Sequence, residues 1–312
     1  MTKRVLLTGA TGFIGRQAVA SLLDRGYEVH AVTTRAEPPA GTGASWHRAD
    51  LLDPSAPRAV VEQTEPTHLL HLAWYAEPGA FWTSEANVRW LEASLRLLRA
   101  FAAIRGRRAV VAGTSAEYDW SVAGVCREGV TPVAPRTLYG QCKAALHAVT
   151  ERFYAAPKMP ALAWGRVFFL YGPHEHPDRL VSSVARALLQ GHPAPCSHGR
   201  QVRDFLYSVD VARAFVALLD SDVKGAVNIG SGTPTMIAEV VQLVAEATGR
   251  ADLLQLGAIP VRADEPAELV ANVKRLRDEI GFVPHFTLEE GILATVDWWR
   301  NSSGGAARFV SG

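Results

Sequence analysis

The chain has 312 residues, of which 48% are hydrophobic, so it is long enough to bury a large core in one big domain or two closely packed ones. Its 32 basic and 31 acidic residues give a formal net charge of +1 and are spread along the chain, which argues against a nucleic-acid-binding stripe or a polybasic membrane anchor. No stretch approaches the ~20 apolar residues that a membrane-spanning helix needs.

The first half of the chain alternates short β-rich runs with helical patterns. The expected elements, in chain order, are a strand at 4–9, a helix at 13–26, strands at 28–34 and 67–74, a helix at 87–104, a strand at 108–115 and a helix from 137. Strands this apolar, alternating with helices, are typical of a parallel sheet covered on both faces. We therefore expect a doubly wound α/β fold.

Three glycines separate the first strand from the first helix, in the stretch LLTGATGFIG. Gly9 permits a tight turn, Gly12 lets the backbone approach a pyrophosphate, and Gly15 lets the helix pack on the strand. The start of the helix presents free N–H groups and the positive end of its dipole to the phosphates. This position after a strand and before a helix is the context in which such a motif binds a dinucleotide. The residues of the loop expected at the cofactor are Gly9, Thr11, Gly12, Phe13, Ile14 and Gly15.

A second pattern, TLYGQCKAALHAV at 137–149, places a Tyr four residues before a Lys. Four residues are just over one helical turn, so Tyr139 and Lys143 share a face of the predicted helix. Because an ammonium near a phenol favours the phenolate, we expect Lys143 to lower the pKa of Tyr139 from its reference value near ~10. Such a Tyr gives or takes a proton at neutral pH. The pattern is common by itself and also fits an ordinary amphipathic helix, so its meaning depends on the rest of the chain.

The glycine loop, spaced GxxGxxG, and the Tyr–Lys pair occur in the order found in the short-chain dehydrogenase/reductase superfamily. The chain resembles its extended branch, which contains nucleotide-sugar epimerases, dehydratases and ketoreductases, over nearly its whole length. The resemblance implies a Rossmann domain over 1–172 with return segments near 203–232, and a smaller, discontinuous α/β substrate domain within 173–312. It also implies a homodimer, formed through the helices that contain 87–101 and 139–154.

The end of the second strand bears on the choice of cofactor. An acidic residue there would bind the ribose 2′-OH of NAD, but Thr33 occupies the position. Thr34 and Arg35 offer a hydroxyl and a guanidinium to a 2′-phosphate, so we expect NADP(H) in preference to NAD(H), which remains possible. The alternative is that Arg35 is a solvated loop charge. By resemblance, further cofactor contacts are expected from Asp50, Leu51, Leu72, Ala73, Trp74 and Asn87.

The resemblance adds a Ser or Thr to the Tyr–Lys pair. Counting back from Tyr118 gives Thr114, with Ser115 as a near rival. By resemblance, the Thr114 hydroxyl binds the substrate oxygen, Tyr139 transfers the proton, and Lys143 holds the nicotinamide ribose. A hydride then moves between the nicotinamide and a carbinol or carbonyl carbon, since the cofactor carries the hard chemistry.

The residues after Thr114 are expected near the substrate. The family's 4,6-dehydratases carry Asp-Glu directly after this Thr, as acid and base, whereas this chain has Ser115 and Ala116 there. Glu117 lies one position beyond the expected pair, so the pattern disfavours water elimination. We expect Ser115, Ala116 and Glu117 to line the substrate pocket together with Trp74.

Two arginines resemble the family's contacts to the substrate diphosphate. Arg203 in RDF and Arg262 in VRADEPA would anchor a pyrophosphate, each charged hydrogen bond contributing ~1.5–3 kcal/mol. The alternative is two surface arginines. Phe169 stands where many relatives have an Asn that binds the sugar or phosphate, which puts that contact in doubt. The aromatic residues expected to shape the sugar pocket are Trp74, Tyr75, Phe81 and Trp82.

Disulfide and metal patterns are missing from the sequence. Cys126, Cys142 and Cys196 are far apart and odd in number, which indicates a reducing compartment, the cytoplasm. His174 and His176 lie in a predicted loop with no further ligand set, so we expect no metal site.

These patterns predict an NAD(P)-dependent nucleotide-sugar oxidoreductase, preferentially a 4-ketoreductase that uses NADPH. One alternative is a 4-epimerase that retains NAD⁺, and another is a non-catalytic NADP-binding regulatory protein, although such relatives usually lack the Tyr–Lys pair. A reductase of flavonol- or steroid-like ketones would fit the aromatic residues, but an uncharged ligand needs neither Arg203 nor Arg262. The expected partner is a nucleotide-diphosphate sugar, with no nucleic acid and no membrane.

Overall fold

The computed structural model describes residues 3–122, 124–261 and 265–302. Its larger sheet has seven strands in the order β11-β7-β5-β4-β1-β2-β3, and all neighbouring pairs are parallel. The strands are β1 (Lys3–Thr8), β2 (Tyr27–Thr33), β3 (Ser45–Arg48), β4 (His68–His71), β5 (Arg108–Thr114), β7 (Ala161–Val167) and β11 (Gly225–Ile229). The strand order reverses between β1 and β4, and a crevice at the carboxyl ends of the strands at such a point is where these sheets bind ligands. The predicted fold class is confirmed.

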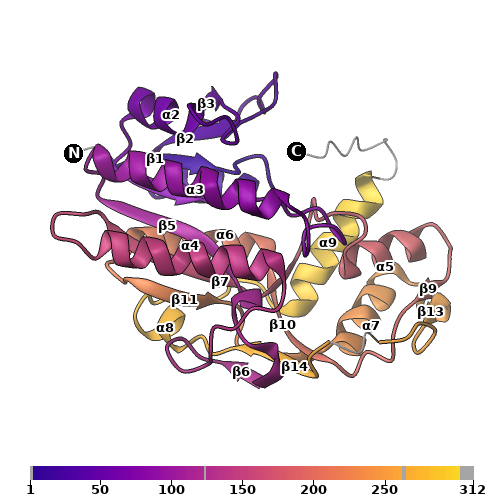
Figure 1. Cartoon of the computed structure of the whole chain (residues 1–312). Coiled ribbons are helices and arrows are strands. Elements are labelled where there is room, and N and C mark those ends of the chain that lie inside the picture. Colours follow the sequence, from indigo (N-terminus) through magenta and orange to yellow (C-terminus); the bar gives the residue numbers. More distant parts are fainter. Residues whose placement is uncertain (1–2, 123, 262–264, 303–312) are drawn as a thin grey trace.

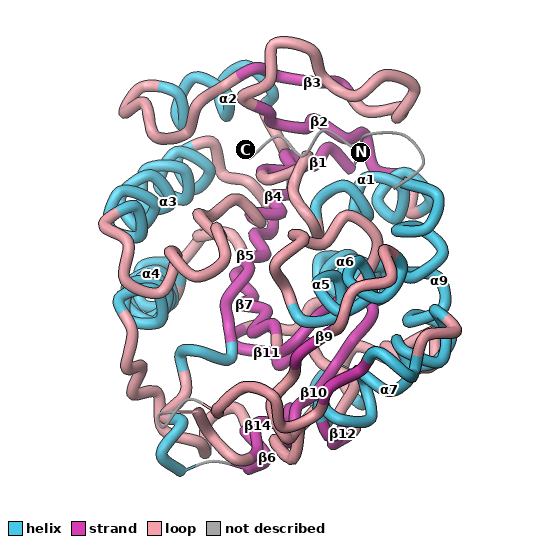
Figure 2. The backbone as a smooth tube through the Cα atoms, turned by 90° about the vertical axis from the view of Figure 1, so that its right-hand side faces the viewer, coloured by secondary structure: helices cyan, strands magenta, loops and turns pink. Residues whose placement is uncertain are grey.

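Helices cover both faces of this sheet, as Figures 1 and 2 show. On one face lie α2 (Ala56–Thr64), α3 (Ala86–Ala103) and α4 (Leu138–Tyr154), and on the other lie α1 (Gly15–Asp24) and α6 (Ser208–Asp220). Side chains of the strands alternate between two apolar clusters: in β1, Leu6 packs toward α2, α3 and α4, whereas Val5 and Leu7 pack toward α1 and α6. Burial on both faces explains why these strands are apolar throughout.

A smaller sheet and a third group of helices come mostly from the second half of the chain, with one strand and two short turns from the segment between β5 and α4. Strand order is β12-β10-β14-β6, with β8 on β10, and β13 pairs separately with β9. These strands are β6 (Gly124–Cys126), β8 (Phe169–Tyr171), β9 (Ala194–Pro195), β10 (Val202–Tyr207), β12 (Pro234–Met236), β13 (Leu254–Gln255) and β14 (Glu268–Ala271). The helices and short turns are α5 (Leu180–Leu189), α7 (Ile237–Thr248), α8 (Lys274–Asp278), α9 (Leu288–Ser302), η1 (Ser115–Glu117), η2 (Trp120–Val122) and η3 (Ala251–Leu253). Helices α5, α7 and α9 share an apolar cluster of their own, on the right of Figure 1.

The chain crosses between the two sheets more than once. After β10 it returns to the larger sheet as α6 and β11, where Val227 and Ile229 join the same core as β1, and then leaves again for β12. This passage coincides with the return segment expected near 203–232, while the boundaries of the two domains stay a prediction.

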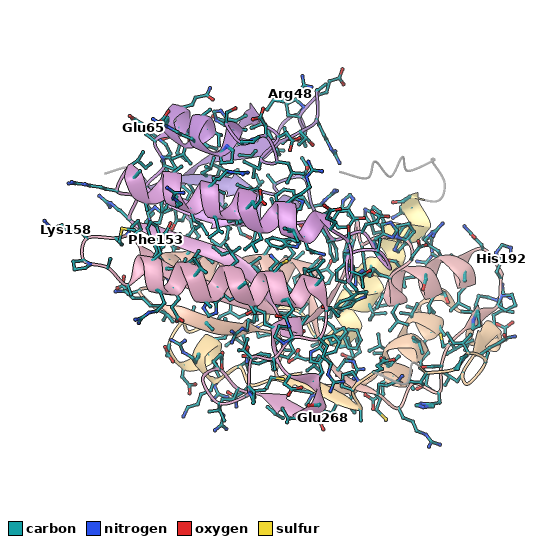
Figure 3. The ribbon with its side chains drawn as sticks, viewed as in Figure 1. Arg48, Glu65, Phe153, Lys158, His192 and Glu268 are labelled. Atoms are coloured by element: carbon teal, nitrogen blue, oxygen red, sulfur yellow. The ribbon has the colours of Figure 1, made fainter. Side chains whose placement is uncertain are left out.

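Several apolar side chains remain exposed on the outer helices. Val88 on α3 and Val149 and Phe153 on α4 are the examples on the side predicted to form a dimer. Figure 3 labels Phe153 near the end of α4. Within the described ranges, no helix combines the length and the apolar character needed to cross a membrane.

Candidate active site

The glycine loop lies between β1 and α1, where the sequence places it. Gly9 has a φ of 71°, and its carbonyl oxygen accepts a hydrogen bond of 2.9 Å from the Gly12 N–H. A Cβ on Gly15 would lie 2.0 Å from the same oxygen, so no other residue fits there. A Cβ on Gly9 would lie 2.7 Å from the backbone nitrogen of Ala73. The loop is therefore a cradle of bare backbone at the start of a helix, which suits a pyrophosphate.

The end of β2 gathers two arginines. The Thr33 hydroxyl accepts a hydrogen bond of 3.1 Å from the Arg35 backbone N–H and so holds the turn, while Thr34 is exposed. The Nε of Arg35 is buried and has no hydrogen-bond partner among the residues the structure describes. Arg16, on α1, donates from Nη2 to the Thr11 carbonyl oxygen at 2.9 Å. Burial and the charge of Arg35 lower the pKa of Arg16, so the two guanidiniums lie close enough to repel each other.

The other predicted cofactor contacts divide into two groups. Leu72, Ala73 and Trp74 follow β4, and the backbone of Leu72 and Ala73 lies against Gly9 of the glycine loop. Asp50 is exposed, and its carboxylate accepts a 3.0 Å hydrogen bond from a backbone N–H two residues on, whereas Leu51 packs into the apolar core below α2. All of these contacts remain predictions.

Asn87 has a structural role. It is fully buried on α3, and its Oδ1 accepts from the Trp74 indole at 2.9 Å. Its Nδ2 donates to the carbonyl oxygens of Phe81 and Ser84 at 2.7 and 2.8 Å. Its amide is occupied by these structural bonds, and the cofactor contact by Asn87 stays a prediction. Asn87 braces the loop that carries the aromatic residues.

The three predicted catalytic residues are brought together by the end of β5 and the start of α4. Thr114 ends β5, and the short turn η1 (Ser115–Glu117) follows at once. Helix α4 begins with Thr137 as its N-cap, whose Oγ1 accepts from the Gly140 N–H at 3.1 Å. A Cβ on Gly140 would lie 2.4 Å from a carbonyl oxygen of η1, so the helix presses closely on this turn. This close packing of α4 on η1 places Tyr139 beside Thr114, whose hydroxyl interacts with the phenol.

The pKa values of Tyr139 and Lys143 differ from the expectation. Burial raises the pKa of Tyr139 to about 12, and the Glu117 charge adds to the rise, whereas Thr114 and Arg179 lower it. Burial lowers the pKa of Lys143 from 10.5 to about 7, against the opposing charge of Glu117. The prediction that Lys143 lowers the pKa of Tyr139 is wrong for the cofactor-free chain, because burial removes much of the charge that would act on the phenol.

Lys143 is held in place by two contacts. Its Nζ donates to the Ala112 carbonyl oxygen at 2.7 Å and lies 3.9 Å from the ring centroid of Trp74. An ammonium group has three N–H donors, so further donors remain for a ligand. Trp74 thus connects Lys143 to the segment beside the glycine loop.

Glu117 lies beneath the catalytic residues and not in the substrate pocket. Its side chain is 0% exposed. Oε1 accepts from the Thr114 backbone N–H and from the Trp164 indole, both at 2.9 Å, and Oε2 accepts from Arg166 Nε at 2.8 Å. The predicted substrate contact by Glu117 is therefore wrong. No local pattern pointed to its partners, because Trp164 and Arg166 are nearly 50 residues away.

Arg166 extends this network through β7 to α4 and β11. Its Nη1 donates to the Tyr118 hydroxyl at 3.2 Å, and that hydroxyl donates to Asn228 Oδ1 at 2.7 Å. Its Nη2 lies 3.4 Å from His147 Nδ1. Although burial alone lowers the pKa of Arg166, Glu117 and Tyr118 raise it above its ordinary value. The floor of the site is thus a connected polar network.

Two of the aromatic residues expected to shape the sugar pocket form a wall beside Tyr139. The ring of Phe81 meets Tyr139 edge-on at 5.0 Å between centroids, and that of Trp82 does so at 5.9 Å. Trp82 also meets Trp120 edge-on at 5.9 Å. The sequence missed one member of this wall, Arg179, whose guanidinium carbon lies 5.2 Å from the Phe81 centroid.

The predicted substrate contacts lie in several places. Ser115 and Ala116 are buried beside Thr114 in η1. Phe169 is half-buried, and the Arg203 guanidinium carbon lies 5.4 Å from its ring centroid. Nη2 of Arg203 pairs with Glu265 Oε1 at 2.8 Å, so a diphosphate at this residue would meet an already paired cation. Arg262 lies outside the described residues.

The two histidines considered for a metal face different partners. The His174 ring packs on Trp298 at 4.5 Å, whereas His176 Nε2 lies 3.5 Å from Glu77 Oε1. No group of three or more His, Cys, Asp or Glu side chains suited to a metal occurs in the part of the chain that the structure describes.

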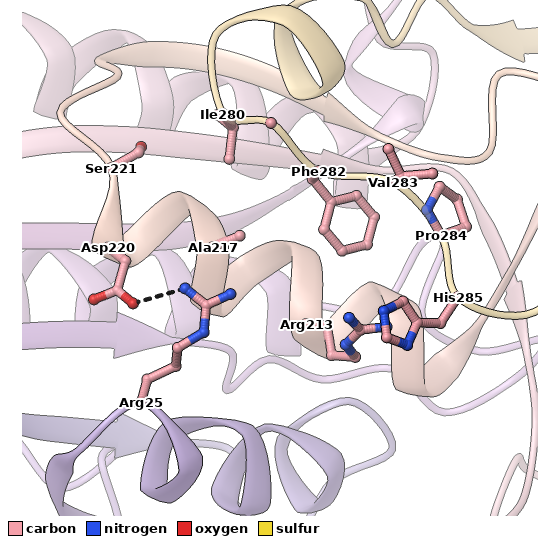
Figure 4. Close-up of a pocket in the computed structure, with 11 residues that line it drawn as sticks. Arg25, Arg213, Ala217, Asp220, Ser221, Ile280, Phe282, Val283, Pro284 and His285 are labelled. Atoms are coloured by element: carbon pink, nitrogen blue, oxygen red, sulfur yellow. Dashed lines mark hydrogen bonds and ion pairs between the residues drawn. The ribbon is translucent and has the colours of Figure 1, made fainter.

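A cavity of about 440 Å³ lies elsewhere, on the α1 and α6 face of the sheet (Figure 4). Arg25 and Arg213 line it, but Arg25 pairs with Asp220 at 3.1 Å and Arg213 with Asp210 at 2.9 Å. Tyr139 lies on the opposite face, on α4, so this cavity is separate from the site described above.

Comparison with known proteins decides the family. The family described as "NAD dependent epimerase/dehydratase family" matches residues 5–230, which include the glycine loop and all three predicted catalytic residues. The chain belongs to this family. It is accordingly an NAD(P)-dependent enzyme of the extended short-chain dehydrogenase/reductase type, as the resemblance implied.

Individual relatives match this family member over nearly its whole length. A probable UDP-glucuronate 4-epimerase of Rhizobium meliloti is 26% identical over 339 residues, with 95% of this chain and 96% of the relative covered. MoeE5, solved with UDP-glucuronic acid and NAD, is 32% identical, with a TM-score of 0.81 and coverage of 96% of this chain and 99% of that chain. The UDP-glucose 4-epimerase of Thermus thermophilus, solved with NAD, is 29% identical, with a TM-score of 0.79 and coverage of 97% of this chain and 100% of that chain.

Proposed function

We propose that this enzyme oxidises and re-reduces C4 of a nucleotide-diphosphate sugar, as a 4-epimerase. The observation that carries the proposal is the meeting of Thr114, Tyr139 and Lys143 at the end of β5, beside the glycine loop. The relatives described above include a 4-epimerase solved with NAD, which supports this reaction over the ketoreductase that the sequence alone favoured. The acid–base pair of a dehydratase is missing, since Ser115 and Ala116 follow Thr114 and Glu117 is fully paired.

The residues present fit a dinucleotide. The bare backbone of Gly9, Gly12 and Gly15 would hold its phosphates, since a side chain at Gly9 or Gly15 would clash with backbone atoms. The free N–H donors of Lys143 would hold the nicotinamide ribose. When bound, NAD(P) supplies the acceptor and donor of the hydride.

Tyr139 handles the proton. With a pKa of about 12 it is protonated at neutral pH, which suits it to donate a proton to a carbonyl oxygen at C4. In the opposite direction it must accept the proton of the C4 hydroxyl, and the Thr114 hydroxyl and the Arg179 charge favour the phenolate that does so. The Thr114 hydroxyl is placed to hydrogen-bond the same substrate oxygen. The aromatic wall of Phe81 and Trp82 limits access of water to the phenol.

A 4-ketoreductase that uses NADPH is the second candidate. The end of β2 favours it, because Thr33 replaces an acidic residue and the charges of Arg16 and Arg35 lie close enough to repel each other. A 2′-phosphate would supply the anion that relieves this repulsion. A reductase consumes its cofactor and suits NADPH, whereas an epimerase returns it and suits a retained NAD⁺.

The substrate contacts and the assembly complete the proposal. Arg203 would bind the diphosphate in exchange for part of its pairing with Glu265, and Trp74 and Phe169 would flank the sugar and nucleotide. The non-catalytic and uncharged-ketone alternatives have no support from the relatives. A cytoplasmic homodimer built through α3 and α4 remains our expectation.

The test starts with the freshly purified protein. Denaturation and mass spectrometry identify any dinucleotide it releases. Stoichiometric NAD⁺, followed by conversion of UDP-glucose or UDP-glucuronic acid to the C4 epimer, is the expected result. A protein that is empty, binds NADPH more tightly than NADH and reduces a 4-keto nucleotide sugar would replace the epimerase by the ketoreductase. Tyr139→Phe should lower kcat by roughly 10²–10⁴-fold, the usual contribution of a positioned proton-transfer group, and an unaffected kcat would contradict both reactions.

A further inference from the structure

Arg179 is a cation at the reacting end of the site. It precedes α5, and its guanidinium carbon lies 5.2 Å from the ring centroid of Phe81. Phe81 in turn meets Tyr139 edge-on at 5.0 Å. Arg179 also acts on Tyr139 electrostatically, since its charge lowers the pKa of the phenol. We therefore expect a group that binds Arg179 to lie near the substrate carbon on which Tyr139 acts.

No protein anion is bonded to this cation. Across residues 3–122, 124–261 and 265–302, the side chain of Arg179 has no ion pair and no hydrogen bond, and its contact is the Phe81 ring. The nearby carboxylates of Glu77 and Asp178 lie 3.5 and 3.8 Å from nitrogens of His176 instead. A half-buried guanidinium whose donors bond no described residue can bind an external anion, because its planar fork matches a carboxylate.

One carboxyl group, that of Glu175, feels the Arg179 charge without bonding to it. Glu175 is buried, and its Oε2 accepts a hydrogen bond of 2.9 Å from the Ser182 hydroxyl. Burial raises the pKa of Glu175 to about 7, although Ser182 and Arg179 oppose the rise. Near neutral pH this group is therefore only partly ionised, and it leaves most of the charge of Arg179 for a ligand.

Two other arginines near the expected substrate position are already paired. Arg166 binds Glu117 at 2.8 Å, and Arg203 binds Glu265 at the same distance. Arg203, the expected diphosphate contact, lies in a different group of side chains, beside Phe169 on β8 and β10. In the proposed function Arg203 takes the diphosphate, which leaves Arg179, beside Phe81, for the sugar end of the substrate.

We propose that Arg179 binds a carboxylate carried by the sugar, so that the substrate is a nucleotide-activated uronic acid. This inference rests on the proposed chemistry at C4. A uronic acid carries its carboxylate on the carbon attached to C5, the ring atom next to C4, so an arginine beside Tyr139 is suitably placed. The ring of Phe81 excludes water from one side of the guanidinium, which strengthens its attraction to the carboxylate. Two relatives described above, one named for UDP-glucuronate and one solved with UDP-glucuronic acid, agree with this substrate class.

The decisive experiment compares two substrates that differ at C6 alone, UDP-glucuronic acid and UDP-glucose. We expect Arg179→Ala to lower kcat/KM for UDP-glucuronic acid by roughly 10- to 100-fold more than for UDP-glucose, the range for a charged hydrogen-bonded contact. Arg179→Lys should restore part of the difference, since it keeps the charge and loses the fork. Arg186→Ala is the matched control, because Arg186 lies on the same helix with its guanidinium carbon 5.3 Å from the Trp299 ring, away from Tyr139. It should leave both substrates unaffected.

Binding measurements separate this inference from the proposed function. Calorimetric titration of each protein with UDP-glucuronic acid, UDP-glucose and UDP shows whether Arg179 recognises the carboxylate even if no epimerisation occurs. Loss of affinity for UDP-glucuronic acid alone in Arg179→Ala supports the inference, and absent turnover in the native enzyme then counts against the 4-epimerase. An equal loss for both sugars, with a shifted pH–rate profile, would show that Arg179 acts only through Tyr139 and would overturn the inference.

Discussion

Two ion pairs of this enzyme have the same length and different surroundings. Glu117–Arg166 and Glu265–Arg203 both measure 2.8 Å. The side chains of the first pair are 0% and 4% exposed, whereas Glu265 is 28% exposed and Arg203 is 2% exposed. Glu117 also accepts from the Thr114 backbone N–H and the Trp164 indole. The first pair is closed and fully hydrogen-bonded and holds the floor of the site. Because Glu265 is partly exposed, the second pair is half-open, and we expect the Glu265 carboxylate to move into water when a ligand binds Arg203.

Breaking the closed pair should have the largest effect. Glu117→Gln keeps the shape of the side chain but leaves the Arg166 charge buried without compensation, which costs about 3–5 kcal/mol of unfolding free energy. Urea unfolding of the cofactor-free protein measures the loss. Glu265→Gln is the matched variant and should lower the unfolding free energy by less than about 1 kcal/mol, because its pair is partly solvated. Equal losses in the two variants would contradict the distinction.

Lys143 is a third case beside the two ion pairs, because it is a buried amine that has no carboxylate bonded to it among the described residues. Its pKa is about 7 in the folded chain against 10.5 as the ordinary value, so the unfolded chain binds more protons between these pH values. Its contribution to stability therefore rises with pH across that window and is most unfavourable below pH 7. Lys143→Met should raise the unfolding free energy on the order of a few kcal/mol near neutral pH and less toward pH 10, while abolishing turnover. A gain that does not change with pH would refute this account.

Arg203 tests whether the half-open pair serves a ligand. Arg203→Met removes the expected diphosphate contact and should weaken UDP binding roughly 10-fold. The change is followed by tryptophan fluorescence or calorimetry. Unchanged UDP affinity would make Arg203 a structural residue, like Arg166.

The smallest effect is expected from the partner of Arg203. Glu265→Gln frees the guanidinium, so UDP binding should tighten by up to about 5-fold, the value of a partly exposed pair. Since salt screens exposed pairs, the gain should shrink in 1 M NaCl, where the screening length is about 3 Å. Weaker binding of UDP would instead mark Glu265 as a ligand contact in its own right.

The sequence predicts best where function depends on neighbours in the chain. Gly9, Gly12 and Gly15 could be placed because the strand, turn and helix that they join are contiguous. Tyr139 and Lys143 could be paired because they share one turn of α4, and Thr114 because β5 ends there.

The remaining features depend on contacts between distant segments. Glu117 looked like a pocket residue because its partners Trp164 and Arg166 come from another strand. Arg179 meets Phe81 across nearly 100 residues, and no local pattern announces such a contact. The raised pKa of Tyr139 follows from burial in the folded chain, a tertiary property that charge spacing along a helix does not contain.

The hydrogen bond from Tyr118 to Asn228 spans 110 positions and ties β11 to the floor beneath Thr114. The glycine loop and Tyr139 leave the ribosome well before β11 is synthesised. Arg166 bonds Tyr118, and Tyr118 gains its partner Asn228 only when β11 has joined the edge of the sheet. Domains fold as units during synthesis, the N-terminal part first. We therefore expect a nascent chain that stops short of β11 to be degraded or held by chaperones. The enzyme should become active only after β11, the edge strand of the larger sheet, has been synthesised.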